Sequence, residues 1–288
     1  MKNKIIDCIT FFNENFIFEL RYNIVKKYVD YLVVCESEYD HRGNKKNLNF
    51  DYKKYSHDQK IKYLIHKEPF PKNHNPWVNQ AIQREFILKN LTFAENEDYI
   101  FFSDPDEIPN PALYQDFKLE KKYGIFLQKS FVYKFNLFNK YESPWEGTRV
   151  CKKKNLKSID FMRQHVKSKN LKYSFLRFDK EKNIQIFYNG GWHFNNIMTS
   201  EEISKKLKID IINKLNKILK VDISKHIEME RILSPKDIEI KTLSKFGSLY
   251  GSSSNSMNSA FLRHPNFSNQ IKNLFFCGGS VHLGRGIP

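Results

Sequence analysis

The sequence lacks long hydrophobic runs. No stretch of its 288 residues approaches the 18 or more apolar residues that a membrane-spanning helix needs. An apolar, strand-like segment begins almost at once, at Ile5, which is the start expected of a protein without a secretory signal. We therefore expect a cytoplasmic protein without a signal peptide or transmembrane helix, although its net charge of +16 allows peripheral contact with an anionic membrane surface.

Cysteine is scarce as well. The four cysteines, Cys8, Cys35, Cys151 and Cys277, show neither Cys-x-x-Cys pairing nor regular spacing. This argues against a zinc ribbon and against a disulfide framework, and it fits a reducing compartment. Cys8 and Cys35 lie in segments with the composition of strands, where a free cysteine most often acts as a small buried hydrophobe.

The sequence also lacks an arginine-rich stripe. Lysine and arginine number 48 against 32 acidic residues, but they are spread along the chain and are not gathered on one helix or tail. A concentrated basic face is typical of nucleic-acid-binding proteins, so we do not expect nucleic acid as a partner. A diffuse positive field suits small anionic substrates, such as sugar nucleotides, equally well.

What the chain does contain is an alternation of apolar and amphipathic segments. Strands are expected at residues 5–12, 31–35, 62–66, 99–102, 124–136 and 184–188. Residues 16–28 and 78–91 lie between strands and repeat apolar side chains at helical spacing. This order predicts an α/β fold with a mostly parallel sheet and helices on its faces. A further amphipathic helix is expected at residues 206–220.

The most informative segment follows the strand at residues 99–102. Asp104, Asp106 and Glu107 come directly after it, and Pro105 fixes the backbone between the two aspartates. Carboxylates are costly to bury unpaired, so they are expected at the carboxyl edge of the sheet, where open α/β sheets bind ligands. Asp104 and Asp106 are predicted to hold Mg²⁺ or Mn²⁺, with Glu107 as a third ligand or orienting a metal-bound water. A solvated acidic turn is the alternative.

Polar residues also follow the first two expected strands. Asn13 and Glu14 follow the first strand and Glu36 follows the second, which places all three at the edge that carries Asp104. The base and ribose of a nucleotide would lie there. Capping of the next helix is the alternative for Asn13.

A glycine pair, Gly190-Gly191, precedes Trp192 and His193. Glycines let the backbone approach another segment closely, which makes His193 the best candidate to reach the metal or a diphosphate from a distant part of the chain. Trp192 is assigned to substrate binding. A packed core pair is the alternative for these two rings.

Two further assignments concern the general base and the diphosphate. Glu146 stands beside Trp145, an arrangement common where a protein faces a sugar, and it is our candidate for the general base. A surface glutamate is the alternative. Arg84 and Arg149 are candidates for bidentate diphosphate binding, and structural pairing with Glu85 or another carboxylate is the alternative for them.

Together these motifs resemble glycosyltransferase family 17 over about residues 1–207. The matching motifs are Ile6-Asp7-Cys8, Phe11-Phe12-Asn13-Glu14, Glu19-Leu20-Arg21, Val29-Asp30, Glu36-Ser37 with His41 and Gly43, Trp77, Arg84-Glu85, the run from Ser103 to Pro109, and Gly190-Gly191-Trp192-His193-Phe194. The resemblance implies a GT-A-like nucleotide-sugar fold, an Asp-x-Asp metal site and inversion at the anomeric carbon. The best-known members are β-1,4-mannosyl-glycoprotein 4-β-N-acetylglucosaminyltransferases, enzymes of N-glycan processing. A His-Glu-bearing segment that usually follows the Gly-Gly-Trp-His motif in the family is missing.

Residues 208–288 resemble a different family, the C-terminal part of phytoene-desaturase and amine-oxidase-type flavin oxidoreductases. The matching motifs are Ser234-Pro235-Lys236-Asp237, Gly247 to Gly251, Ala260 to Arg263 and Asn273 to His282. The chain has no Gly-x-Gly-x-x-Gly fingerprint for the dinucleotide phosphates, so no FAD binding is expected. We therefore expect a glycosyltransferase domain at 1–207 and an incomplete flavoprotein-like appendage at 208–288, which is a fusion, a remnant or a chimeric splice.

The sequence thus predicts a metal-dependent, inverting glycosyltransferase. By resemblance, its donor is a UDP-sugar, UDP-N-acetylglucosamine, and its acceptor is a glycan or surface polysaccharide. Asp106, Glu107 and Glu146 are assigned as catalytic, and Asp104, Asp106 and His193 as metal ligands. Two other classes stay open: a phosphohydrolase with Asp104 as nucleophile and Asp106 as acid/base, and a flavin-oxidoreductase fragment that acts through the tail.

Overall fold

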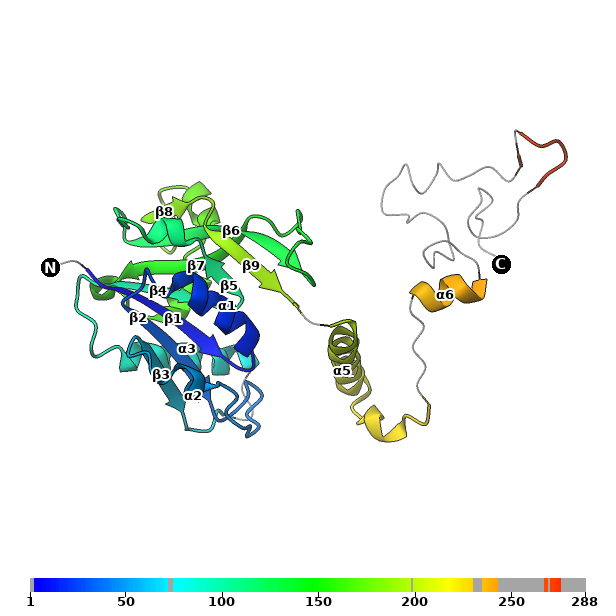
Figure 1. Cartoon of the computed structure of the whole chain (residues 1–288), viewed down its shortest axis with the longest axis horizontal. Helices are drawn as coiled ribbons and strands as arrows, with labels where there is room; N and C mark the ends of the chain where they lie inside the picture. Colours follow the sequence, from blue (N-terminus) through cyan, green and yellow to red (C-terminus); the bar gives the residue numbers. More distant parts are fainter. Residues whose placement is uncertain are drawn as a thin grey trace. The chain divides into compact units, whose positions relative to one another are not determined.

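The computed structural model describes residues 3–71, 75–197, 199–229, 235–242, 267–268 and 270–275. The chain divides into two units, Met1–Lys206 and Leu207–Pro288 (Figure 1). Most of the desaturase-like motifs, including Gly247 to Gly251, Ala260 to Arg263 and Cys277, lie outside the described residues.

Within the described residues, one nine-stranded sheet organises the first unit. Its strands are β1 (Ile5–Phe11), β2 (Tyr31–Ser37), β3 (Ile61–His66), β4 (Tyr99–Ser103), β5 (Glu107–Pro109), β6 (Tyr123–Val132), β7 (Trp145–Lys152), β8 (Ile184–Phe187) and β9 (Gly191–Asn195). Their order is β3-β2-β1-β4-β7-β6-β9-β5, with β8 also paired to β6. Strands β1 to β4 run parallel, as do β6, β8 and β9, whereas β7 is antiparallel to β4 and β6. The predicted α/β class with a mostly parallel sheet is confirmed.

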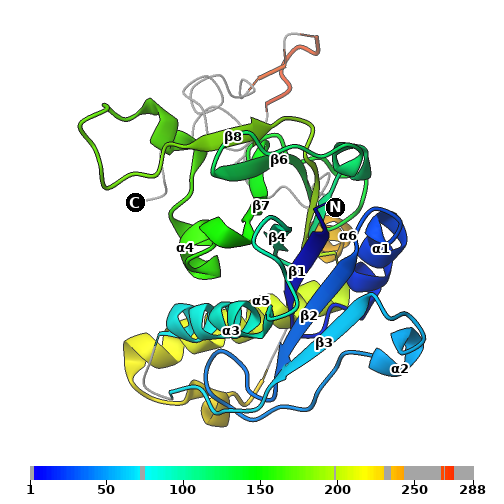
Figure 2. The same ribbon diagram turned by 90° about the vertical axis from the view of Figure 1, so that its left-hand side faces the viewer.

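Helices cover both faces of the parallel half of this sheet. The α-helices are α1 (Asn15–Val25), α2 (Tyr52–Tyr55), α3 (Pro76–Asn90), α4 (Ile159–Gln164), α5 (Ser200–Leu219) and α6 (Pro235–Thr242), and the 3₁₀-helices are η1 (Pro111–Tyr114), η2 (Lys153–Asn155), η3 (Ser168–Lys172) and η4 (Ile223–His226). Successive side chains of β1 point to opposite faces: Ile9 packs in one core with Phe18 of α1, and Cys8 in another with Ile87 of α3. Figure 2 shows α1 and α3 on opposite sides of β1 and β2.

The free cysteines Cys8, Cys35 and Cys151 are buried, as expected for Cys8 and Cys35. Among the residues that the structure describes, no helix combines the length and the apolar character needed to cross a membrane.

The topology brings the predicted motifs together. Because β1, β2 and β4 are parallel, the segments that follow them share one edge of the sheet. The turn after β4 leads directly into β5, where Glu107 lies opposite His193 of β9. His193 in turn lies opposite Ser130 of β6. Gly191 makes this pairing possible: its φ is +121°, and a Cβ there would stand 2.2 Å from the carbonyl oxygen of Ile108.

Candidate active site

Arg163 of α4 holds two of the three carboxylates of the turn. Its Nη2 donates to Asp104 Oδ2 at 2.7 Å and to Glu107 Oε1 at 2.5 Å. The fully buried Glu107 also accepts from Trp145 Nε1 at 2.6 Å and from the backbone N–H of Asp104 at 3.0 Å. Burial raises the pKa of Glu107, and the nearby charges of Asp104 and Asp106 add to this effect while Arg163 opposes it. Glu107 therefore holds the turn in place through hydrogen bonds made in the protein interior.

Arg84 of α3 contacts the second oxygen of Asp104. Its Nη2 lies 3.4 Å from Asp104 Oδ1, and its Nη1 donates to Asp160 at 2.9 Å. Burial would raise the pKa of Asp104, but the charges and hydrogen bonds of Arg163 and Arg84 outweigh it and lower the pKa. The Arg84 side chain is 2% exposed, and its Nε has no hydrogen-bond partner among the described residues. Arg84 thus keeps one unused buried donor beside the turn.

Asp106 pairs with His193. Asp106 Oδ2 lies 3.6 Å from His193 Nε2, and the aspartate side chain is 32% exposed. Burial tends to lower the pKa of His193, but the contact with the negatively charged Asp106 raises it overall. The imidazole stacks on Trp145 with the ring centroids 4.3 Å apart, and its Nδ1 lies 3.4 Å from Ser130 Oγ. Ser130 Oγ donates to Glu142 at 3.2 Å.

Of the three predicted metal ligands, Asp106 and His193 are the two that no arginine binds within the described residues, and they could hold a divalent cation. Among the described residues, no group of three or more His, Cys, Asp or Glu side chains is arranged to hold a metal ion by itself. Both oxygens of Asp104 are taken by arginines. A carboxylate with an imidazole nonetheless fits Mn²⁺ or Mg²⁺, because such ions in phosphate-transfer sites commonly take one or two protein ligands and complete their shells with substrate phosphates and water.

A cleft of about 530 Å³ opens beside Asp104. We call it the tryptophan cleft, and it is lined by Trp77, Gln80, Arg84, Asp104, Pro144, Trp145, Glu146, Arg163, Gln164, Lys167 and Lys169. Trp77 is 69% exposed and so presents an apolar face to any ligand. Aromatic faces next to a few convergent charged groups are typical of sites that bind polar ring-shaped ligands.

Glu146 lies in the tryptophan cleft, and Arg149 lies behind it. Glu146 accepts from Arg149 Nη2 at 3.0 Å, from the backbone N–H of Ser168 at 3.0 Å and from the Ser168 hydroxyl. Arg149 is fully buried, and it also donates to the carbonyl oxygens of Val166, Glu146 and Gly147. Burial and the neighbouring Arg163 lower the pKa of Arg149 to about 10. This geometry does not support the predicted diphosphate contact of Arg149, because its donors are used inside the protein.

Glu36 is likewise an internal residue. It is fully buried and accepts from Lys46 at 2.6 Å, from Tyr63 at 2.7 Å and from the backbone N–H groups of Asn49 and Phe50. These bonds shape the loop after β2. The geometry therefore does not support the predicted nucleotide contact of Glu36.

Asn13 and Glu14 do lie at the predicted edge. Asn13 is exposed, and Glu14 Oε2 accepts from the backbone N–H groups of Phe12 and Asn13, both at 2.9 Å. Burial raises the pKa of Glu14, and the charge of Asp106 contributes to that rise. Asn13 does not cap α1, whose first turn is preceded by Glu14.

Trp192 is separate from these residues. Adjacent side chains of a strand point to opposite faces, so Trp192 faces away from His193. It lines an apolar groove of about 480 Å³ together with Phe16, Phe135 and Phe194. The structure therefore does not bring the predicted substrate ligand Trp192 to the tryptophan cleft.

The sequence analysis missed Arg163 and Lys167. Arg163 lies in a six-residue helix and meets Asp104 from 59 positions along the chain. Short helices carry too little periodicity to mark their inward face. The single available signal was Ser158, whose side chain caps α4 by accepting from the backbone N–H of Phe161 at 2.9 Å.

Comparison with known proteins identifies the family. Residues 1–193 match the model of glycosyltransferase family 17, so the chain belongs to that family. Two solved structures are distantly similar. A glycosyltransferase involved in glycosylation of the major capsid of PBCV-1 gives a TM-score of 0.32 at 12% identity over 65% of this chain and 82% of that one. The inositol-1-phosphate CTP transferase of T. maritima gives 0.35 at 13% over 70% and 94%.

Carotenoid-modifying enzymes match a shorter part of the chain. The 1-hydroxycarotenoid 3,4-desaturase of Flavobacterium sp. (strain P99-3) is 47% identical over 88 residues, and the 4,4'-diapolycopene oxygenase of Methylomonas sp. is 34% identical over 92. These matches cover 31% and 32% of this chain. The chain spans only 18% of the length of either relative.

Proposed function

We propose that this protein is a metal-dependent, inverting glycosyltransferase. Its donor is a nucleotide sugar, UDP-N-acetylglucosamine by family resemblance, and its acceptor is a glycan or polysaccharide. One observation carries the proposal beyond family membership: the turn from Asp104 to Glu107 ends at the carboxyl edge of the parallel strands and opens into the tryptophan cleft.

In this proposal, the two arginines and the carboxylates of the acidic turn have different roles at the diphosphate. Arg163 and Arg84 bind Asp104 and keep it ionised, whereas neither arginine binds Asp106 within the described residues, and its side chain is 32% exposed. Asp106 and His193 would hold the divalent ion, which when bound neutralises the charge that develops on the leaving diphosphate.

The tryptophan cleft is proposed to hold the reacting sugars. An inverting transfer needs a base within hydrogen-bond reach of the acceptor hydroxyl. Asp104 and Glu146 are the carboxylates that line the cleft, and both oxygens of Asp104 are in arginine ion pairs. Within the described residues, Glu146 Oε1 accepts hydrogen bonds only from Ser168, so an acceptor hydroxyl can take the place of the serine hydroxyl. We therefore assign Glu146 as the base.

A phosphohydrolase with Asp104 as nucleophile is not favoured. A nucleophilic carboxylate needs an oxygen free to attack phosphorus. Arg163 and Arg84 bind one Asp104 oxygen each.

Equilibrium binding of UDP to the full chain, with and without Mn²⁺, tests the proposal. We expect Mn²⁺ to tighten UDP binding, and Asp106→Asn and His193→Ala to weaken the Mn²⁺-dependent part by roughly 10- to 100-fold, as losses around a metal commonly do. Glu97→Gln, which removes an exposed carboxylate bound to Lys152 and Lys154, is the matched control. Equal UDP binding with and without Mn²⁺, or in Asp106→Asn, would contradict the proposal. Hydrolysis of a panel of UDP-sugars then identifies the donor.

A further inference from the structure

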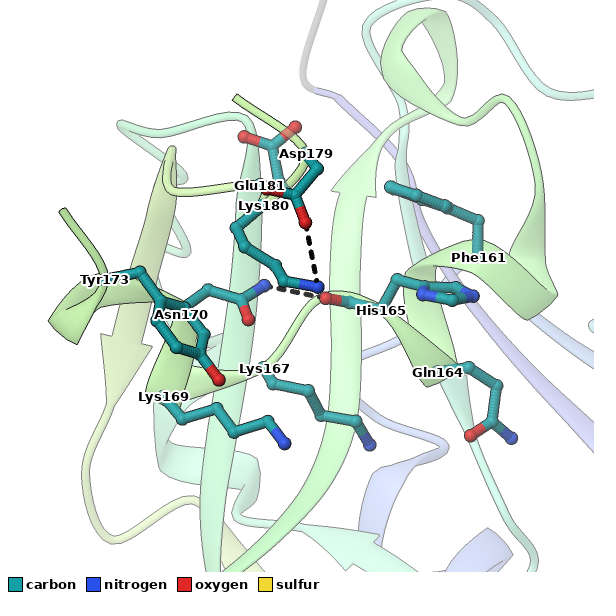
Figure 3. Close-up of a pocket in the computed structure, with 10 residues that line it drawn as sticks. All are labelled: Phe161, Gln164, His165, Lys167, Lys169, Asn170, Tyr173, Asp179, Lys180 and Glu181. Atoms are coloured by element: carbon teal, nitrogen blue, oxygen red, sulfur yellow. Dashed lines mark hydrogen bonds and ion pairs between the residues drawn. The ribbon is translucent and has the colours of Figure 1, made fainter. Parts of the chain in front are cut away.

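A second cavity lies next to the tryptophan cleft and is shown in Figure 3. This cavity of about 190 Å³ shares Gln164, Lys167 and Lys169 with the cleft. We call it the lysine pocket and define it by Phe161, His165, Lys167, Lys169, Tyr173 and Lys180. Its wall combines the end of α4, the segment leading through η3, and the loop before β8. The two cavities are therefore adjacent, with the three shared side chains between them.

The acidic side chains of this pocket are already neutralised. Asp179 is bound by Arg177 at 2.7 and 2.8 Å and by Lys180 at 3.1 Å. Glu181 is bound by Lys122 at 3.1 Å. Neither carboxylate is left to balance the two lysines shared with the cleft.

Lys167 and Lys169 have no such partners. Within the described part of the chain, neither ammonium group makes a hydrogen bond or an ion pair. Both side chains line both cavities, and Figure 3 shows them extending in the same direction. Where the two cavities meet, two ammonium groups therefore stand without an ion-pair partner among the described residues.

The surroundings of Lys167 disfavour its charged form. The side chain is half-buried, and the charges that act on it are those of Arg149 and Glu146 on β7, Arg163 on α4 and Glu107 on β5. Burial, followed by the two arginines, lowers the pKa of Lys167 to about 8. A partly desolvated cation beside other cations is stabilised by an incoming anion.

We propose that the lysine pocket binds an anionic group of the acceptor, a carboxylate or a phosphate ester, beyond the sugar in the tryptophan cleft. The assignment of the anionic group to an acceptor rests on the proposed function, whereas the anion site rests on the pocket itself. Phe161, with His165 stacked on it at a centroid distance of 5.3 Å, and Tyr173 supply ring faces for an adjoining sugar. The protein is thereby specific for acidic over neutral glycans.

Direct binding of defined probes to the full chain tests this site. We use trigalacturonate, glucose 6-phosphate and the neutral trisaccharide maltotriose, in titration calorimetry at low ionic strength. Both anionic probes, or one of them, should bind at least about tenfold more tightly than maltotriose, because charge-assisted hydrogen bonds are the strong ones. The double variant Lys167→Ala/Lys169→Ala should lose this preference, and Lys167→Arg should keep it.

Lys172→Ala is the matched control, since Lys172 lies in η3 but does not line either cavity. Preference for the uronate assigns a carboxylate, and preference for the sugar phosphate assigns a phosphate ester. Equal binding of neutral and anionic probes, or an equal loss in Lys172→Ala, overturns the inference. Displacement of the probe by UDP with Mn²⁺ also overturns it, because the lysines would then belong to the donor. If UDP fails to bind while the anion still does, the proposed function fails and the anion site stands.

Discussion

Replacing Arg163 with methionine tests whether this arginine organises the acidic turn. The change keeps most of the apolar volume but removes the partner of Glu107, a carboxylate with no exposed surface, and one of the two partners of Asp104. Breaking a buried ion pair by removing one partner costs about 3–5 kcal/mol, because an uncompensated charge remains. Against a total stability of about 5–15 kcal/mol this is a large loss, and chemical denaturation at pH 8 measures it.

The pH dependence and a second substitution make the test specific. The pKa of Glu107 is already raised by burial and rises further without Arg163. A carboxyl whose folded pKa exceeds its unfolded value destabilises the protein as pH rises from the unfolded value through the folded one. The deficit of Arg163→Met should therefore be smaller at pH 5 than at pH 8.

Adding Glu107→Gln to Arg163→Met should recover more than half of the loss at pH 8, since the fully buried side chain that lost its partner is then uncharged. Arg177→Met, which breaks an exposed ion pair with Asp179, is the control and should leave stability almost unchanged. If Arg163→Met costs less than about 1 kcal/mol, or if the double variant is no more stable than the single one, the buried-charge reasoning is refuted.

Three further predictions follow from named contacts. Anion binding at the lysine pocket should weaken as pH rises through about 8, where Lys167 loses its proton, and Lys167→Arg should abolish this dependence; titrations of trigalacturonate from pH 6.5 to 9.5 would show it. Glu146→Gln should lower kcat by roughly 10²- to 10⁴-fold while UDP binding stays constant, which steady-state kinetics with a UDP-binding control would separate. Gly191→Ala should weaken Mn²⁺-dependent UDP binding and lower the melting temperature. The added Cβ would stand 2.2 Å from the Ile108 carbonyl oxygen, and the alanine would have to adopt a φ of +121°. Unchanged calorimetric curves would contradict this prediction.

The elements that the sequence predicted best are those with a strong physical period. The apolar strand at residues 99–102 and the carboxylates after it were placed correctly at a sheet edge, because burial of the former excludes burial of the latter without partners. The glycine pair before His193 correctly indicated a close backbone approach, which the structure shows against β5.

Side-chain partners were harder to predict than strands. Glu36 and Arg149 have the residue types and positions of ligands, yet both are buried among internal partners. Composition and spacing do not distinguish a charged side chain that binds a substrate from one that pairs with other residues of the protein. Arg163 pairs with Asp104 and Glu107 from a short helix far along the chain. No local sequence pattern predicts such a pairing.

The hydroxyl of Ser130 has a consequence for the site that it supports. Its one proton goes to Glu142, so toward His193 its oxygen acts as an acceptor, and Nδ1 is the protonated ring nitrogen. In the neutral ring, Nε2 then turns a lone pair toward Asp106, and two electron-rich atoms face each other at 3.6 Å. That gap favours a positive charge: a proton, which the raised pKa of His193 reflects, or a divalent ion. Ser130, on a neighbouring strand, thus makes a proton and a divalent ion compete for the same position between His193 and Asp106.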